Sequence, residues 1–422
     1  MCRSIILLFS ILLIGLKAYS QNPDPKDETT QTEKDSIKKI EFSRSLMNGY
    51  LPTRYFDFDL RYLIKFNQYE GLRTGIGGVT NENFSDRYKI QGYTVYGFRD
   101  HRFKYNIGGG FRITEKTNTW LHVSYTDDLQ ETGSSKFLTD KRFFQFFEPR
   151  LLNIDLFHKH ITKAITLEHR ISDKLLTESQ IALSKIDPTY NYTFAVDDQL
   201  YNNYDLSLLK ISIQWNPFNT FNDDETIAGY PEFAVQYTKS FNDIVKGDFS
   251  FSKLDLRTVY KLKHVNESST ELVLSAGLAT GKTPITHLYH AYPNNVNKET
   301  ILQRFSVAGI NSFETMYFNE FFSDRFATLQ LKHKLRPFKI TKRLKPELVL
   351  ISRYALGNMT NIERHQGIDF KTLDKGYSES GFEINNLLFG FGLSFAYRYG
   401  SYHLAEFEDN FAFKFTFNVK LD

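Results

Sequence analysis

Two glycine-rich stretches have the composition of loops that hold nucleotide phosphates. They are RTGIGGVTNENFS (residues 73–85) and GLATGKT (residues 277–283). A dinucleotide-binding loop needs G-x-G-x-x-G between a strand and a helix, but Thr80 stands at the third glycine position and no amphipathic helix follows. GLATGKT has three residues between its glycines, where a phosphate loop needs four. We therefore expect no nucleotide and no other cofactor.

Carboxylates and histidines are the next candidates for chemistry. His158 and His160 lie close in sequence to Asp155, as in a metal site or a protease dyad, but no third ligand follows at a diagnostic spacing. No G-x-S-x-G elbow of a lipase is present. The carboxylates that could form acid–base pairs lie in segments where charges of both signs alternate with apolar residues, and they are Asp57, Asp59, Glu168 and Asp255. Such charges are typical of a polar wall, so we expect no enzymatic activity and no metal site.

The N-terminus has the features of a cleaved export signal. Arg3 precedes an apolar run at residues 5–16, and Ala-Tyr-Ser at 18–20 fits a signal-peptidase site. Twelve apolar residues are fewer than the roughly 20 that a membrane-spanning helix needs. We predict a signal peptide at 1–20 and a flexible periplasmic leader at 21–49, which is polar and too poor in apolar residues to fold alone.

Composition excludes some classes of protein. The chain has 52 Lys and Arg against 49 Asp and Glu, and this balance gives no basic excess for binding nucleic acid. Its single cysteine, Cys2, lies in the predicted signal, so the exported protein would have no disulfide. With 39 Phe and 25 Tyr the chain is rich in aromatics, yet its mean hydropathy is −0.40. That combination is typical of strands with one apolar and one polar face.

Strict alternation of apolar and polar residues recurs from Tyr50 to the C-terminus. In YFDFDLRYLIKFN (55–67) the apolar face spans residues 56–66, the length that a tilted strand needs to cross a bilayer. The pattern predicts an all-β protein, a transmembrane antiparallel β-barrel of about 14–16 strands over residues 50–422. A soluble sandwich or lipocalin-like protein is the alternative, but sandwich strands are usually shorter.

This interpretation assigns faces to particular side chains. The polar residues predicted to face the lumen are Asp57, Asp59, Arg61, Lys65, Lys104, Arg112, Lys210, Asp255, Arg257 and Arg398. In the last strand one face consists of Phe411, Phe413, Phe415, Phe417, Val419 and Leu421. We predict that the outer-membrane assembly machinery of a Gram-negative bacterium recognises this strand during insertion, and that lipid covers its apolar face.

Three longer runs resemble a known family. They are GIGGVTNENFSDRYKIQGYTVYGFRDHRFKYNIGGGFRI (75–113), INSFETMYFNEFFSDRFATLQLKHKL (310–335) and GYSESGFEINNLLFGFGLSFAYRYGSY (376–402). They resemble an uncharacterised outer-membrane barrel family, a domain of unknown function often found after a carboxypeptidase-regulatory-like domain. That family is distantly similar to the sixteen-stranded surface-antigen superfamily, which includes outer-membrane assembly factors and two-partner secretion transporters. In those transporters a lid loop carries an Arg-Gly-aromatic motif. The corresponding place here reads VAGINSFETM (307–316) and does not contain that motif.

Long connections between the predicted strands bear on function. The stretches 128–160, 187–203, 216–230, 280–312 and 357–380 are too long for hairpin turns and are predicted to be loops or plugs. The first hypothesis is a pore, translocation or assembly-related barrel without catalytic activity. The second is a surface-exposed binding or assembly platform with a plugged lumen and an unknown surface or periplasmic protein partner. An outer-membrane hydrolase is the third.

Overall fold

The computed structural model describes residues 48–142, 149–218, 229–296, 306–338, 340–341, 345–388 and 390–417, together with 39, 42, 43, 45 and 46. Clustering of contacts divides the chain into Met1–Leu46 and Met47–Asp422, and the architecture below is that of the second unit. The predicted signal peptide lies outside the described residues, as do Val419 and Leu421 of the last predicted strand.

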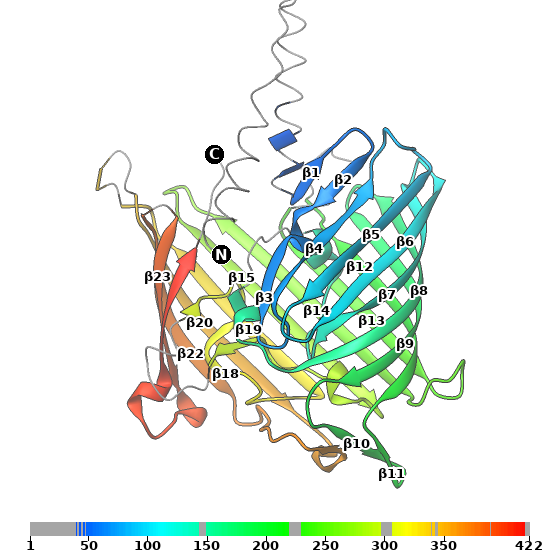
Figure 1. The fold of residues 1–422 in the computed structure, drawn as a ribbon. Helices are drawn as coiled ribbons and strands as arrows, with labels where there is room; N and C mark the ends of the chain where they lie inside the picture. The colour runs from blue at the N-terminus through cyan, green and yellow to red at the C-terminus, as the bar shows by residue number, and fades with distance from the viewer. Residues whose placement is uncertain are drawn as a thin grey trace, which may run out of the picture. The chain divides into compact units, whose positions relative to one another are not determined.

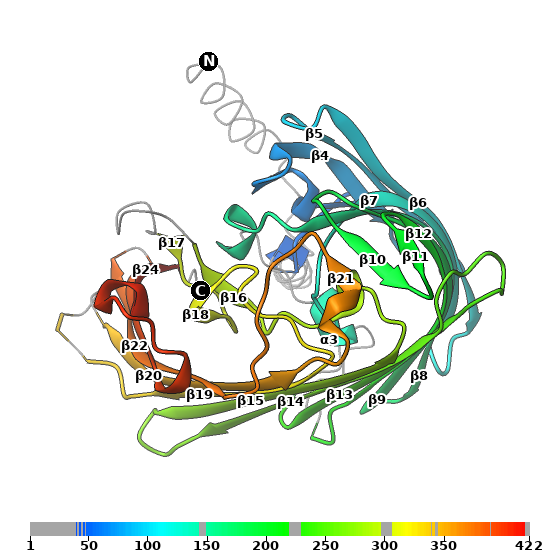
Figure 2. The ribbon, with the colours of Figure 1, turned by 90° about the horizontal axis from the view of Figure 1, so that it is seen from below.

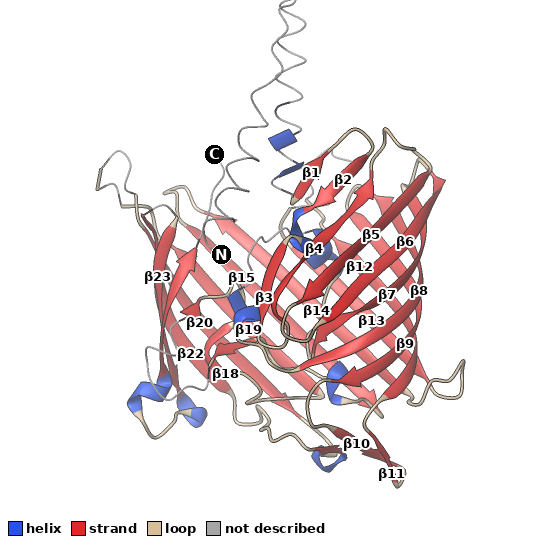
Figure 3. Ribbon diagram, viewed as in Figure 1, coloured by secondary structure: helices blue, strands red, loops and turns tan. Residues whose placement is uncertain are grey.

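Strands dominate the described residues (Figure 3). The long ones are β4 (Gly71–Thr80), β5 (Tyr88–Gly97), β6 (Arg102–Thr114), β7 (Thr119–Glu131), β8 (Phe157–Ser172), β9 (Leu175–Pro188), β12 (Tyr204–Trp215), β13 (Glu232–Phe241), β14 (Phe251–Lys263), β15 (Ser269–Gly281), β19 (Arg325–Lys334), β20 (Glu347–Asn358), β22 (Tyr377–Leu388), β23 (Phe391–Tyr399) and β24 (Phe411–Phe417). With the short strands β1 (Tyr50–Pro52), β2 (Phe56–Asp59), β3 (Ile64–Asn67) and β17 (Ser306–Val307), they form one 19-stranded sheet. We call this sheet the wall (Figure 1).

Two small sheets and a few short helical turns complete the unit. One sheet contains β10 (Thr193–Val196), β11 (Gln199–Tyr201) and β21 (His365–Gln366), and the other contains β16 (Pro293–Asn295) and β18 (Phe313–Tyr317). The described helices are α3 (Leu138–Arg142), η2 (Leu60–Tyr62), η3 (Pro149–Leu152), η4 (Ile285–His287), η5 (Ile362–Arg364), η6 (Gly400–Tyr402) and η7 (Phe407–Asn410). No helix among the described residues is long and apolar enough to cross a bilayer.

The all-β fold is confirmed, but two details of the prediction are wrong. The stretch 55–67 is not one strand: the 3-10 turn η2 separates β2 from β3, and both of these pair with β4. The Asp59 carboxylate explains the break, because it accepts hydrogen bonds from the backbone N–H (2.9 Å) and the Nε (2.8 Å) of Arg61 and so stabilises a local turn.

The wall is also not closed. The described pairings run from β1, β2 and β3 through to β24 without joining the two ends. The outer edge of β24 pairs instead with β17 in parallel, at Ser306↔Lys414 and Val307↔Phe415. If β2 and β3 count as one interrupted strand and the short β1 and β17 are left out, the described part of the wall has sixteen strands, the upper end of the predicted range. Figure 2 shows the wall curving round β16, β18, β21 and α3.

Glycines of the first stretch allow a close approach within the wall. A side chain at Gly77 would begin only 2.5 Å from both Tyr62 and Tyr93, whose rings stack with centroids 4.1 Å apart. The stretch therefore shapes strand β4, and residues 81–87 form the turn that follows it. This agrees with the exclusion of a phosphate loop.

Burial alternates along the wall with the polar side chains inside. In β24 the side chains of Ala412, Lys414 and Thr416 are buried, whereas Phe411, Phe415 and Phe417 are exposed. The large exposed apolar side chains occur on strands all along the wall, for example Ile107, Ile181 and Leu356. A wall with its apolar side chains outward and its polar side chains inward is what a barrel in lipid requires.

We expect Ile107→Arg to lower the free energy of unfolding in lipid by about 2–4 kcal/mol, because it places a cation on a lipid-facing strand. Ile107 lies in the middle of β6 and is 63% exposed, so the same change on a surface in water would cost little. The measurement is urea unfolding of the protein reconstituted in vesicles. Val265→Arg, in the exposed 264–268 turn, is the control. Equal stabilities of the two variants would contradict a lipid-facing wall.

Candidate functional site

The connection between β15 and β19 lies inside the wall. We call residues 283–296 and 306–323 the luminal segment; it includes η4, β16, β17 and β18. Phe313 and Met316 of β18 are fully buried and pack against Ala355 of β20 and Tyr377 of β22. Most of the 280–312 stretch predicted to be a loop or plug therefore fills space on the polar face of the wall, and residues 297–305 of it lie outside the described residues.

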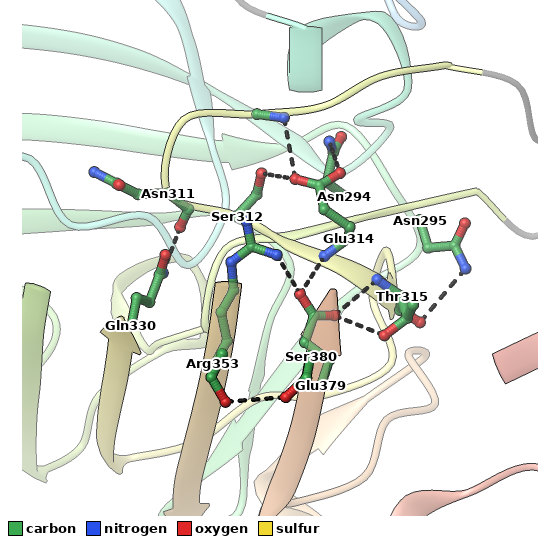
Figure 4. Close-up of polar contacts among 12 residues, drawn as sticks. Asn294, Asn295, Asn311, Ser312, Glu314, Thr315, Gln330, Arg353, Glu379 and Ser380 are labelled. Carbon is green, nitrogen blue, oxygen red and sulfur yellow. Dashed lines mark hydrogen bonds and ion pairs between the residues drawn. The ribbon is translucent and has the colours of Figure 1, made fainter. Parts of the chain in front are cut away.

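A buried carboxylate of the wall holds the backbone of this segment. Glu379 of β22 accepts hydrogen bonds from the backbone N–H groups of Glu314 (3.0 Å) and Thr315 (2.9 Å) and from the Thr315 hydroxyl (2.6 Å) (Figure 4). Its charge is balanced by Arg353 of β20, whose Nη1 lies 2.6 Å from Glu379 Oε1. Both side chains are almost fully buried. The carboxylate thus links two wall strands to β18.

A second buried ion pair joins the segment to the last strand. Glu314 Oε2 lies 2.9 Å from Lys414 Nζ of β24, and both side chains are 1% exposed. The Glu314 carboxylate also accepts hydrogen bonds from Ser312 Oγ (2.8 Å), Asn294 Nδ2 (2.8 Å) and the Gly309 N–H (3.1 Å). Burial alone would raise the pKa of Glu314, but the Lys414 ammonium and the nearby Arg353 guanidinium hold that pKa below its ordinary value. The carboxylate is therefore charged in the folded protein at neutral pH.

Two further contacts hold the segment in place. Glu320 forms a bidentate pair with Arg398 of β23, at 2.7 and 3.0 Å. The Ala308 N–H donates to the Phe415 carbonyl at 2.7 Å, which extends the pairing of β17 with β24. The luminal segment is thus bound to β20, β22, β23 and β24 through buried ion pairs and hydrogen bonds, in addition to the apolar contacts of Phe313 and Met316. These contacts are the candidate functional site.

The connection between β7 and β8, which contains η3, also contacts the luminal segment. Arg150 of η3 binds Glu131 at 2.6 Å and donates from its Nε to the Pro293 carbonyl of the luminal segment at 2.9 Å. His290 of the segment also contacts Glu131, at 2.7 Å. These contacts make the two connections one polar body inside the wall.

The ten predicted lumen-facing residues are placed as follows. Asp59, Lys104, Asp255 and Arg398 are buried, and Asp57, Arg61, Lys65, Arg112, Lys210 and Arg257 are half-buried. Lys104 pairs with Glu70 at 2.6 Å, and Arg257 pairs with Asp140 of α3 at 2.8 Å. Of the ten, Arg398 binds the luminal segment through its ion pair with Glu320. Glu314, Arg353, Glu379 and Lys414 were not predicted.

The two histidines considered for a metal site or a protease dyad contact threonine hydroxyls. His158 is buried in β8 with the Thr132 hydroxyl 3.3 Å from its Nδ1, and His160 Nδ1 lies 2.9 Å from the Thr162 hydroxyl. Asp155 accepts instead from the Asn319 side chain, at 2.8 Å. Across the described ranges no group of three or more His, Cys, Asp or Glu could hold a metal ion. That the protein is not an enzyme stays a prediction.

Residues 46–344 match a family whose description reads "Family of unknown function (DUF5686) C-terminal domain". The chain belongs to this family. No curated protein matches its sequence. Among solved structures, the fold is similar to BamA from Haemophilus ducreyi lacking POTRA domains 1–3, with a TM-score of 0.52 and 10% identity over 91% of this chain and 77% of that one.

Two further outer-membrane barrels are similar at lower scores. CdiB from Acinetobacter baumannii has a TM-score of 0.44 and 12% identity over 83% of this chain and 57% of that one. Wzi is described as a carbohydrate-binding barrel involved in group 1 capsule assembly in Escherichia coli. It has a TM-score of 0.28 and 10% identity over 90% of this chain and 85% of that one. At such identities the comparison with BamA shows the fold alone. The fold of this DUF5686 chain is therefore similar to that of an outer-membrane barrel, although no described pairing closes the wall.

Proposed function

We propose that this DUF5686 chain is an integral outer-membrane barrel that forms a gated pathway for translocation or assembly, and that its own luminal segment keeps the pathway closed. The observation that carries the proposal is the polar interface between that segment and β20–β24. Buried ion pairs such as Glu314–Lys414 contribute little net stability compared with apolar packing. Such pairs give the interface a polar part that water can hydrate once the surfaces separate, beside the apolar contact of Phe313 and Met316 with Ala355 and Tyr377.

Ion conductance in planar bilayers tests this proposal. We expect the purified protein to conduct weakly and the double variant Glu314→Gln/Glu320→Gln to conduct at least about tenfold more, because losing two ion pairs shifts the closed–open equilibrium by more than 1.4 kcal/mol. The matched control is Glu267→Gln/Glu363→Gln, which removes two exposed carboxylates. A large steady conductance in the unmodified protein, or no difference between the two double variants, would count against the gate.

The second candidate is a surface platform with a permanently filled lumen. It is favoured by the packed end formed by β10, β11 and β21, where Phe194 and Phe249 are buried and Tyr192 Oη lies 2.9 Å from His365 Nδ1. Burial lowers the pKa of His365 to about 4, so this contact is made by a neutral ring. The absence of conductance in planar bilayers for every variant, together with a defined partner crosslinked in native membranes, would favour the platform.

The third hypothesis is an outer-membrane hydrolase, which lipase and protease assays of the purified protein test.

A further inference from the structure

Three long connections of the wall meet at one tyrosine hydroxyl. Tyr192 directly precedes β10, in the connection between β9 and β12. Its Oη accepts a hydrogen bond from the Ile285 N–H of η4, in the luminal segment, at 3.0 Å. The same oxygen lies 2.9 Å from Nδ1 of His365 in β21, which belongs to the connection between β20 and β22. Figure 2 is seen from this end of the wall, opposite the short turns, and shows β10, β11 and β21 next to one another.

The direction of these hydrogen bonds fixes the protonation of His365. A backbone N–H only donates, so the bond from Ile285 uses the Tyr192 oxygen as an acceptor. The hydroxyl hydrogen then donates to Nδ1 of His365, and among the described residues it contacts no other acceptor. Nδ1 must therefore carry a lone pair, and the proton of the neutral ring is on Nε2. A second proton, on Nδ1, would leave the buried hydroxyl hydrogen without an acceptor, which is costly.

The surroundings of the His365 ring also disfavour a positive charge. The ring is buried and stacks on Phe194, with centroids 5.2 Å apart. Burial, together with the neighbouring Arg364 guanidinium, lowers the pKa of His365 to about 4, although the Asp324 carboxylate acts in the opposite direction. An exposed histidine has a pKa of about 6.5. The neutral ring therefore stabilises the packed arrangement fully above about pH 6.5, and this contribution is lost progressively as the pH falls towards 4.

We propose that Tyr192 and His365 form a proton-sensitive latch. The latch holds the small sheet of β10, β11 and β21, which we call the cap, against η4 of the luminal segment. When Nδ1 of His365 takes up a proton from water, the hydrogen bond from Tyr192 is lost and the cap separates from η4 more often. Short turns lie on the periplasmic side of outer-membrane barrels, so the cap lies at the outer end of the wall. The latch needs no ion conduction, so it and the gate proposed above can fail independently.

Labelling of an engineered thiol measures how often the cap separates. The chain's single cysteine is Cys2, so Cys2→Ser gives a background without thiols. Val196→Cys places a thiol on β10 at a position that is 7% exposed and belongs to the same buried cluster as Ile285. Leu200→Cys places one on β11 at a position that is 68% exposed. The reconstituted full chain is treated with a water-soluble maleimide at about pH 7 and about pH 5. Dividing the rate for Val196→Cys by that for Leu200→Cys removes the pH dependence of the thiol itself.

We expect this ratio to rise roughly twentyfold from the higher to the lower pH, because a group whose pKa is about 4 when packed and about 6.5 when exposed shifts the equilibrium by that factor. In His365→Asn the side-chain oxygen still accepts from Tyr192 but does not titrate, so the ratio should stay low at both pH values. Tyr192→Phe removes the donor, so the ratio should already be high at neutral pH and change little on acidification.

The matched control is His101→Asn, which makes the same substitution at an exposed histidine in the turn between β5 and β6 and should show the full rise. Burial lowers the pKa of His287 in η4 to about 3, below the tested range. An equal ratio at both pH values, or an equal rise in His365→Asn, would overturn the latch. If Tyr192→Phe does not fold, His365→Asn alone decides. A ratio that does not change with pH, together with the expected conductance of the gate double variant, would reject the latch and leave the gate intact.

Discussion

Replacing Arg353 with leucine should lower the free energy of unfolding by about 3–5 kcal/mol, because it leaves a buried carboxylate without its cation. The side chains of Arg353 and Glu379 are 1% and 0% exposed and form an ion pair at 2.6 Å. Glu379 would keep its hydrogen bonds from Glu314 and Thr315, but those neutral donors do not balance its charge. Urea unfolding of the reconstituted protein, followed by tryptophan fluorescence, measures the loss.

Two further variants separate the pair from general effects of the substitution. Arg336→Leu removes an exposed arginine from the turn between β19 and β20 and should change stability by no more than about 0.5 kcal/mol. Arg353→Leu/Glu379→Leu leaves no buried charge and should recover part of the loss, since an apolar pair can replace a buried ion pair. A loss below about 1 kcal/mol for Arg353→Leu would show that Glu379 is protonated or hydrated inside the wall.

The wall could be predicted from sequence because its signal is local. Every transmembrane strand needs an apolar side chain at each second position, so β6 and β24 could be recognised from their own residues without knowledge of their neighbours. The break at Leu60–Tyr62 could not, because the residues of η2 continue the alternation. The competing signal was Asp59, which can accept a hydrogen bond from the backbone two residues later.

The candidate site could not be predicted, because its contacts join distant parts of the chain. Glu379 lies 65 residues from Glu314 in the sequence, yet its carboxylate accepts a hydrogen bond from the Glu314 N–H. Nothing in the sequence near either residue indicates the other. Charged residues such as Arg353 and Lys414 have the same position in the alternation as wall residues that do not touch the luminal segment. The open seam depends likewise on the two ends of the wall, at β1–β3 and at β24, and no local pattern determines whether they pair. The long connection at 280–312 was the only available signal, and it indicated the place but not the contacts.

Reversing the charge of Lys414 should release the luminal segment from β24. In Lys414→Glu a third carboxylate would stand beside Glu314 and near Glu379, all of them buried. Because like charges in a buried site repel and neither is solvated, we expect a loss of at least about 3–5 kcal/mol in unfolding free energy. Lys345→Glu, which changes an exposed turn residue, is the control and should be close to neutral.

The charge swap Glu314→Lys/Lys414→Glu distinguishes attraction between the two groups from the packing of either one. It keeps the net charge of the site and restores an opposite pair between β18 and β24, so more than half of the stability lost in Lys414→Glu should return. A swap variant no more stable than Lys414→Glu would show that the aliphatic stem of Lys414 and its contact with the Asn294 carbonyl hold the segment instead. In that case the ion pair would not be the contact whose loss opens the lumen.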